Sequence, residues 1–297
     1  MKLVRFTKDT TDFVGAIFDN DRVVNINYLL DEPSLTMMDL IERGLGFIEH
    51  IESKLENINK SNDKELVAGL EDIVLKAPLP NPGKVVCVGL NYMDHCREQN
   101  VEPPESPLIF SKWPSSIIGP GGNIILPEES KQVDYEAELG VVIGNKGKHI
   151  AEENALDHVF GYVIVNDVSA RDVQFADGQW IRGKSYDTFA PCGPYLVTAD
   201  EVKDPHNLAI RCTVNGEVLQ DSNTNEMIFN INEVVAYLSK GFTFKTGDLL
   251  STGTPDGVGV FRNPKVFLED GDEVVIEIEG LGVLKNTCVS ERKCWFD

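Results

Sequence analysis

The chain has 297 residues and is strongly acidic, because 48 Asp and Glu residues outnumber 27 Lys and Arg residues and give a formal net charge of −21. A surface of this sign repels nucleic acid, and it admits a small anionic substrate only where a metal ion or a local cationic cluster meets it. The composition is that of a globular protein, and no apolar run reaches the roughly 18 residues of a membrane span.

The spacing of the cysteines and the composition of the first ten residues indicate where in the cell the protein is expected. Six cysteines are scattered without the paired spacing of a zinc site, and a disulfide framework is unusual in a chain of this length. The opening MKLVRFTKDT has neither the apolar core of a signal peptide nor the look of a transit peptide. We expect a reducing, intracellular location: cytoplasmic, or the mitochondrial matrix if a presequence is missing.

Residues 1–78 resemble a small α/β module. The segments KLVRF, VGAIFD and RVVNINYLL alternate like short strands. Residues 36–58 carry apolar side chains at helical spacing, which predicts an amphipathic helix. The polar stretch 59–65 indicates an exposed break, and the Pro- and Gly-rich stretch 77–84 indicates a hinge. We therefore predict a second domain over residues 79–297.

From residue 84 onward, short apolar runs are separated by turn signals such as VNGEV. Helical patterns are few, mainly over residues 92–99 and 226–240. This order predicts a β-rich α+β domain rather than an alternating βαβ array. Neither GxGxxG nor GxxxxGK[ST] occurs, so nucleotide-binding folds lose support.

The stretch VDYEAELGVVIG (133–144) places acidic side chains ahead of an apolar run. In a strand, Glu136 and Glu138 share one face, as does Asp134 if the strand already holds there. A solvated edge strand is one interpretation. The apolar run favours the other, a buried strand whose carboxylates bind a divalent cation. Asp167 ends the next apolar run, FGYVIVND, as a turn former or as a third metal ligand.

Three more segments carry candidate chemistry. His95 and Glu98 are helical neighbours in VGLNYMDHCREQN, either a surface pair or a general base with its orienting carboxylate. Lys184 lies in a polar, turn-rich segment in which a solvated lysine would be ordinary. The loop in LLSTGTPDGVG (249–259) offers backbone N–H groups to a carboxylate, although most such loops are only turns.

Taken together and in this order, six blocks resemble the fumarylacetoacetate hydrolase family. They are KVVCVGLNYMDH, PLIFSKWPSSIIGPGG, VDYEAELGVVIG, NDVSARDVQ, GKSYDTFAPCGP and STGTPDGVGVF. The likeness covers the chain from about residue 84, and the N-terminal module extends it to the fumarylacetoacetate hydrolase domain-containing protein 2 type. It implies a mixed β-roll, a homodimer, and a small N-terminal α/β module. The additional upstream Asp ligand of the longest members has no counterpart here, which argues against fumarylacetoacetate itself as substrate.

The resemblance also implies roles for individual residues. The metal, Mg²⁺ or alternatively Ca²⁺ or Mn²⁺, falls on Glu136, Glu138 and Asp167. The catalytic residues it implies are His95, Glu98 and Lys184. The substrate-side residues it implies are Phe110, Lys112, Ser115, Arg171, Gln174, Gly253 and Thr254.

The function expected from this site is metal-dependent chemistry on small anionic 2-oxo acids through a stabilised enolate. The first expectation is hydrolysis of a C–C bond in acylpyruvate-type substrates, decarboxylation of oxaloacetate, or both. Keto–enol tautomerisation of oxaloacetate is the alternative. A metal-binding member without catalysis is a second alternative. No nucleic-acid or membrane partner is expected.

Overall fold

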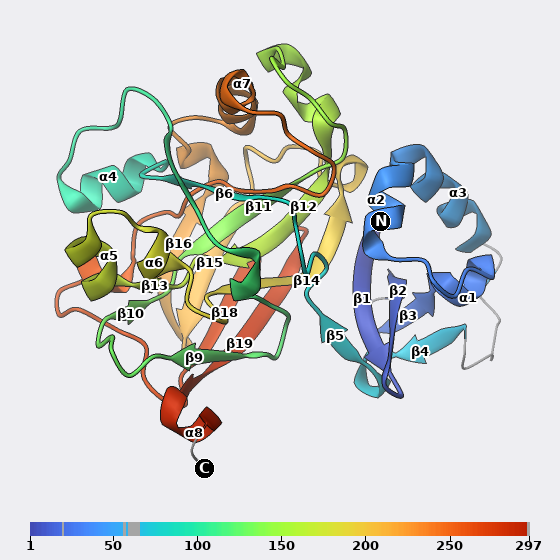
Figure 1. Ribbon diagram of the computed structural model, residues 1–297, viewed down its shortest axis with the longest axis horizontal. Helices are drawn as coiled ribbons and strands as arrows, with labels where there is room; N and C mark the ends of the chain where they lie inside the picture. The colour runs from blue at the N-terminus through green and yellow to red at the C-terminus, as the bar shows by residue number, and fades with distance from the viewer. Residues whose placement is uncertain (20, 56–57, 59–65, 296–297) are drawn as a thin grey trace.

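The computed structural model describes residues 1–19, 21–55, 58 and 66–295 (Figure 1). Within these residues the largest sheet has 12 strands, ordered β4-β3-β2-β1-β14-β12-β11-β17-β6-β7, with β5 beside β1 and β8 beside β14. Its strands are Lys2–Lys8 (β1), Thr11–Phe18 (β2), Arg22–Asn25 (β3), Val67–Gly69 (β4), Val74–Lys76 (β5), Val85–Gly89 (β6), Leu108–Ser111 (β7), Ile117–Ile118 (β8), Ala137–Ile143 (β11), Val159–Asn166 (β12), Ala190–Thr198 (β14) and Leu249–Ser251 (β17).

A second sheet faces the first across the main core. Its order is β16-β15-β18-β19-β9, and β10 and β13 form a separate short pair. The strands are Asn123–Leu126 (β9), Val133–Asp134 (β10), Ser169–Ala170 (β13), Ala209–Val214 (β15), Glu217–Asn223 (β16), Glu273–Ile278 (β18) and Gly282–Ser290 (β19). Apolar side chains of both sheets join in one core cluster, including Leu139 and Ile164 from the first and Ile210 and Ile276 from the second. The β-rich α+β expectation is confirmed.

The acidic strand lies in the middle of the large sheet. All seven residues of β11 are buried, and the strand pairs antiparallel with both β12 and β17. All eight residues of β12 are buried as well. A strand covered on both faces needs a near-continuous apolar run, which VVI and YVIV supply. A solvated edge strand is therefore excluded.

The helices cover the ends and faces of these sheets. They are Ile26–Leu30 (α1), Met37–Arg43 (α2), Leu45–Leu55 (α3), Met93–Gln99 (α4), Arg171–Asp177 (α5), Ile181–Lys184 (α6), Ile231–Gly241 (α7) and Glu291–Trp295 (α8). The helix expected over 92–99 is present as α4. The helix expected over 226–240 begins only at Ile231, because Asn230 and Glu233 form a capping box there.

Two N-terminal predictions need correction. The segment INYLL (26–30) is a helix rather than a strand, since the side chain of Asn25 accepts a hydrogen bond from the backbone N–H of Tyr28 and caps α1. The single helix expected over 36–58 is two helices, because Gly44 adopts φ +76° and ends α2. The polar break at 59–65 lies outside the described residues.

The N-terminal strands join the large sheet through β1 (Figure 1). β1 pairs with β2 and β5 of its own region, and Lys2 and Leu3 also pair with Val197 and Leu196 of β14. The division near residue 78 stays a prediction, since one sheet and one apolar cluster run through both parts.

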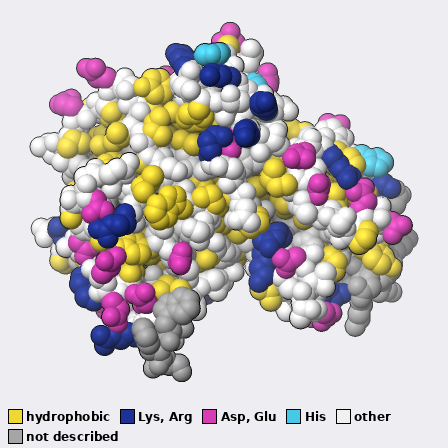
Figure 2. Space-filling view, viewed as in Figure 1, with side chains coloured by type: hydrophobic (Ala, Val, Ile, Leu, Met, Phe, Trp, Pro, Cys, Tyr) yellow, Lys and Arg dark blue, Asp and Glu magenta, His cyan; other side chains and the backbone are white. Residues whose placement is uncertain are grey.

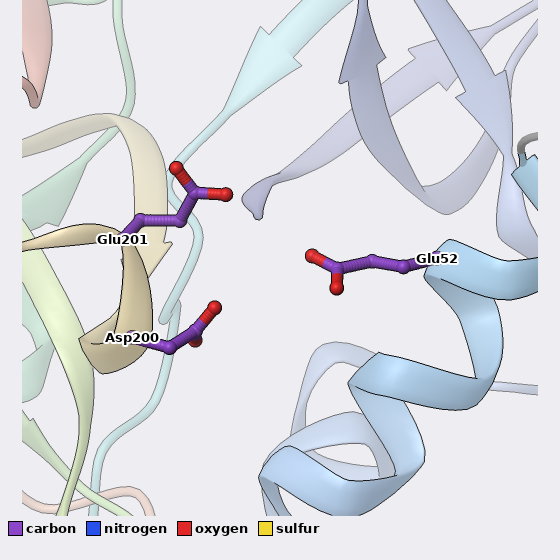
Figure 3. Close-up of side chains that lie close together, drawn as sticks. All are labelled: Glu52, Asp200 and Glu201. Carbon is purple, nitrogen blue, oxygen red and sulfur yellow. The ribbon is translucent and has the colours of Figure 1, made fainter.

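Acidic side chains face each other where the two parts meet. Glu52 of α3 points toward Asp200 and Glu201 of the 3₁₀ turn Ala199–Glu201 (Figure 3). The α-amino nitrogen of Met1 lies 3.0 Å from Glu201 Oε1 and 3.6 Å from Glu52 Oε1. This ammonium group balances part of the negative charge at the junction.

The surface agrees with the acidic composition. Asp and Glu side chains occur on both parts of the face in Figure 2. Among the described residues, no helix combines the length and the apolar character that crossing a membrane would require. The five cysteines whose side chains are described are free and buried.

Candidate active site

One pocket brings most of the sequence-predicted residues together. Its lining includes eight of them, which come from α4, β7, β11 and the residue before it, α5, α6 and the loop after β17. These eight are His95, Phe110, Glu136, Glu138, Arg171, Gln174, Lys184 and Thr254.

Three carboxylates converge beside this pocket. Each of Glu136, Glu138 and Asp167 offers an oxygen, and these oxygens lie within 4.8 Å of one another. The exposed fractions of the three residues are only 5%, 1% and 0%. Glu136 and Asp167 stand at adjoining ends of β11 and β12, where the backbone N–H of Asp167 donates to the carbonyl of Glu136 at 2.9 Å. The fold thus places the predicted metal ligands side by side.

Lys184 lies among these carboxylates rather than in solvent. Its Nζ is 2.7 Å from Glu136 Oε2 and 2.8 Å from Asp167 Oδ2. Burial alone lowers the pKa of Lys184, but the charges of Asp167 and Glu136 outweigh burial and raise it above its ordinary value. Burial raises the pKa of Glu136, but the charges of Lys184 and Arg171 outweigh burial and lower that pKa to about 2.

Glu138 has a different environment. Its Oε2 accepts hydrogen bonds from the Ser251 hydroxyl and, at 3.2 Å, from the Gly253 backbone N–H, both of which are neutral. Burial, followed by the charges of Asp167 and Glu136, raises the pKa of Glu138 well above its usual range. This carboxylate lacks a direct cationic partner among the described residues.

The charges of the cluster do not balance. When all seven groups are ionised, four buried carboxylates face three buried cationic side chains, and the formal charge of the cluster is −1. The seven residues are Asp134, Glu136, Glu138 and Asp167 with Lys112, Arg171 and Lys184. Hard carboxylate oxygens with surplus negative charge suit a divalent cation, so the donor set fits the metal that the sequence implies.

His95 and Glu98 form a hydrogen-bonded pair on α4. His95 Nδ1 is 3.0 Å from Glu98 Oε2, which leaves Nε2 available on a residue that lines the pocket. Glu98 Oε1 also accepts from the Gly257 backbone N–H at 3.0 Å. The carboxylate thus orients the imidazole and ties α4 to the loop after β17. A solvated surface pair is excluded by the burial of His95, which is 6% exposed.

Arg171 is held from two sides at the start of α5. Its Nε donates to Asp134 Oδ2 at 2.8 Å and its Nη1 lies 2.6 Å from Glu136 Oε1. Its Nη1 also donates to Gln174 Oε1 at 3.1 Å. Arg171 Nη2 is buried and has no hydrogen-bond partner in the described part of the chain. An unpaired guanidinium donor in a pocket is an anchor for an anionic ligand.

The loop after β17 is anchored by its side chains. The Thr254 hydroxyl donates to the carbonyl of Ala137 at 2.9 Å and accepts from Gln220 Nε2 at 2.9 Å. The N–H of Gly253 is engaged by Glu138. For the Thr254 N–H, no acceptor is found among the residues that the structure describes. The contact between this loop and a carboxylate stays a prediction, and it would use a backbone donor because the Thr254 hydroxyl is already engaged.

Three predicted substrate residues are absent from the pocket lining: Lys112, Ser115 and Gly253, the last of which is engaged by Glu138. Lys112 is 1% exposed, and its Nζ donates to Asp167 Oδ1 at 2.7 Å, to the Val168 carbonyl at 3.0 Å and to the Lys184 carbonyl. Lys112 therefore stabilises Asp167 of the carboxylate cluster without lining the pocket. Ser115 is exposed and does not line the pocket, so its contact with substrate stays a prediction.

Several residues of the pocket lining were not among the predicted site residues. Trp180 packs edge-on against Phe110 with ring centroids 5.4 Å apart, and Phe261 packs against His95 at 5.8 Å. Phe261 ends the STGTPDGVGVF block, and that position could have indicated it. Trp180 and Gln99 could not be found, because neither stands in a pattern that distinguishes a pocket residue from a surface residue.

Comparisons with known proteins show the family to which the chain belongs. Residues 84–289 match the family described as fumarylacetoacetate (FAA) hydrolase C-terminal. A Xenopus laevis protein named oxaloacetate tautomerase fahd2, mitochondrial, is 48% identical over 296 residues, which cover 97% of this chain and 90% of that protein.

Solved structures are similar over almost the whole chain. Fumarylacetoacetate hydrolase from psychrophilic Exiguobacterium antarcticum is 36% identical with a TM-score of 0.83, and the match covers 98% of this chain and 100% of that one. Maleylpyruvate hydrolase from Sphingobium sp. SYK-6, in complex with manganese(II) ion and pyruvate, is 29% identical with a TM-score of 0.81, over 98% of this chain and 99% of that one. The chain therefore belongs to the fumarylacetoacetate hydrolase family of enzymes.

Proposed function

We propose that the protein is a keto–enol tautomerase acting on oxaloacetate or a closely similar small 2-oxo acid. The observation that carries this proposal is the His95–Glu98 pair, which presents one oriented base to a pocket that also holds carboxylates and an unpaired arginine donor. The 48% identity to a protein named oxaloacetate tautomerase favours this alternative over C–C hydrolysis and decarboxylation, which were the first expectation.

The metal part of the proposal rests on the three clustered carboxylates. Glu136, Glu138 and Asp167 would hold one divalent cation, which we propose to be Mg²⁺. The related maleylpyruvate hydrolase was solved with manganese(II), which supports a divalent ion in this fold. When bound, such an ion polarises a 2-oxo group and makes the neighbouring C–H bond more acidic.

Two unpaired donors would bind the substrate's carboxylates. Arg171 Nη2 supplies a charged donor, and the Thr254 N–H supplies a neutral one from the loop after β17. Both belong to elements fixed by buried hydrogen bonds, so their positions are set before the substrate arrives.

His95 would move the proton. In the keto-to-enol direction its Nε2 accepts a proton from C3, and the electron pair of that C–H bond forms the C2–C3 double bond of the enolate. The imidazolium then returns the proton to the 2-oxygen. Glu98 stabilises the imidazolium through Nδ1 at 3.0 Å, and the Lys184 ammonium offsets charge that develops on oxygen. No water is consumed, so one base is sufficient.

The compartment belongs to the same proposal. We infer an intracellular location, either cytoplasmic or in the mitochondrial matrix. The related Xenopus laevis protein is named as mitochondrial, and the described cysteine side chains are free thiols, which suits a reducing environment.

The proposal is tested on purified protein with added Mg²⁺ by following the ultraviolet absorbance of enol-oxaloacetate as it converts to the keto form. His95→Ala should lower kcat/KM by about 10²- to 10⁴-fold, the range for a lost general base. Pyruvate release from acylpyruvates and CO₂ release from oxaloacetate are measured in parallel.

The matched control is His50→Ala, which removes an exposed histidine of α3. It should leave kcat/KM unchanged. An unaltered tautomerase rate in His95→Ala with its metal content intact, or a wild-type rate no faster than buffer, would refute the proposal.

A further inference from the structure

A buried glutamine outside the predicted site lies at an irregularity in the second sheet. Along β16, Leu219 and Gln220 are both buried although they are consecutive, which breaks the usual alternation of faces. The register explains this: Cys212 pairs with Gln220 and Thr213 with Val218, so Leu219 is the extra residue of a bulge. A bulge redirects a side chain, and here it turns Gln220, only 1% exposed, toward the large sheet.

Gln220 uses both ends of its amide. Its Oε1 accepts a hydrogen bond from the Ala137 N–H at 2.9 Å, and Ala137 stands between Glu136 and Glu138. Its Nε2 donates to Thr254 Oγ1 at 2.9 Å and to the Pro255 carbonyl at 3.0 Å. One side chain therefore joins the strand that bears the carboxylates to the loop that follows β17.

The same strand holds the next part of that loop. Arg262 Nη1 donates to the Leu219 carbonyl at 2.9 Å, and Gly257 runs so close to that carbonyl that a Cβ on it would lie 2.0 Å away. Gly257 in turn donates to Glu98. The loop thus connects Gln220 at one end with the His95–Glu98 pair at the other.

We infer that Gln220 is a positioning residue that fixes the Thr254 backbone donor for a substrate carboxylate and sets the loop on which Glu98 rests. This inference depends on the proposed function only for the identity of the ligand. A residue of this kind acts on ligand affinity through the loop, without contacting the substrate itself.

The test compares wild type with Gln220→Met, which keeps the side-chain volume and removes both hydrogen-bonding ends. With Mg²⁺ present, KM for oxaloacetate should rise about tenfold, which corresponds to about 1.4 kcal/mol of binding free energy, while kcat falls much less. Hydrogen exchange should quicken at the backbone amides of residues 254, 256–259 and 93–99.

The control is Asn286→Leu. Asn286 is 2% exposed, and its Nδ2 donates to the carbonyls of Gly119 at 3.0 Å and Gly122 at 2.9 Å, in a turn that does not line the pocket. Like Gln220→Met, the Asn286→Leu variant loses the hydrogen bonds of one buried side-chain amide. Its thermal stability should fall while KM and exchange in the two segments stay at wild-type values.

A second pair of measurements keeps the inference separate from the tautomerase proposal. Pyruvate binding is titrated in the presence of Mn²⁺, and its Kd should also rise about tenfold in Gln220→Met. If wild type binds pyruvate but does not tautomerise oxaloacetate, the proposed function fails and the positioning role survives.

Gln220→Glu covers the case in which the Met variant does not fold. This variant retains the acceptor for the Ala137 N–H but replaces the nitrogen that donates to Thr254. It should therefore raise both KM for oxaloacetate and Kd for pyruvate. Unchanged KM and Kd in a folded Gln220 variant, with only the loss of stability seen in Asn286→Leu, would overturn the inference.

Discussion

Lys184 and Glu138 show how differently two neighbouring buried charges can be stabilised. Lys184 has two carboxylate partners at 2.7 and 2.8 Å. Glu138 has only neutral donors, and its pKa is raised first by burial. A buried carboxylate without a cationic partner is costly, so Glu138 gains most from a bound cation.

We therefore expect Glu138→Gln to abolish stoichiometric uptake of divalent metal while the chain still folds. Gln is isosteric and can still accept from Ser251 and Gly253, but it lacks the charge that binds the ion. The measurement is Mn²⁺ content per chain by elemental analysis after dialysis, with circular dichroism as the check on folding.

Glu52→Gln is the matched control, since Glu52 belongs to the second acidic cluster, at the junction shown in Figure 3. It should retain the wild-type amount of metal. One Mn²⁺ per chain in Glu138→Gln, or loss of metal in Glu52→Gln, would contradict the assignment of the site.

At the scale of elements, a glycine in the loop after β17 and a glycine in the β15–β16 hairpin are required for different reasons. Gly257 adopts φ +92° and lies against the Leu219 carbonyl, whereas Gly216 adopts φ +81° in the β15–β16 hairpin with no atom within 4 Å of an added Cβ. Only the first combines a left-handed backbone with a close approach.

Gly257→Ala should therefore destabilise the protein more than Gly216→Ala and should also lower activity. The left-handed conformation alone costs a non-glycine residue about 1–2 kcal/mol, which is the loss expected for Gly216→Ala. In Gly257→Ala the loop must also move away from β16, taking with it the contact to Glu98. Urea unfolding and tautomerase rates of both variants provide the measurement. Equal losses of stability with full activity would show that the close approach has no role.

The elements that were predictable are those whose patterns are long and local. Glu136 directly precedes β11, and Asn166–Asp167 stand at the end of β12, so the sequence alone indicated that the acids of the two strands meet. Gln220 was not predictable. A one-residue bulge in β16 turns its side chain inward, and the alternation of apolar and polar residues in the sequence does not reveal where a bulge occurs. The helix α6 was not predictable, because its four residues make little more than one turn and show no period.

The whole molecule is expected to be a homodimer that associates through its β-rich part, as the family resemblance implies. Light scattering coupled to size exclusion should give a mass of about twice 32.9 kDa at both low and high loading. A mass of one chain at every concentration would show that the resemblance does not extend to assembly.

The way β1 is shared has a consequence for synthesis on the ribosome. The partners that complete the ladder β5-β1-β2-β3-β4 all lie before residue 77, so this ladder can pair as soon as it leaves the exit tunnel. The apolar cluster beneath it is different, because Leu3 and Leu40 share it with Phe160 and Leu196. At 5–20 residues per second, about 120 further residues take roughly 6–25 s to emerge. During that interval the strands of the nascent chain are paired, but the apolar side chains beneath them are exposed to solvent. An exposed apolar surface of this kind is a binding site for a ribosome-associated chaperone.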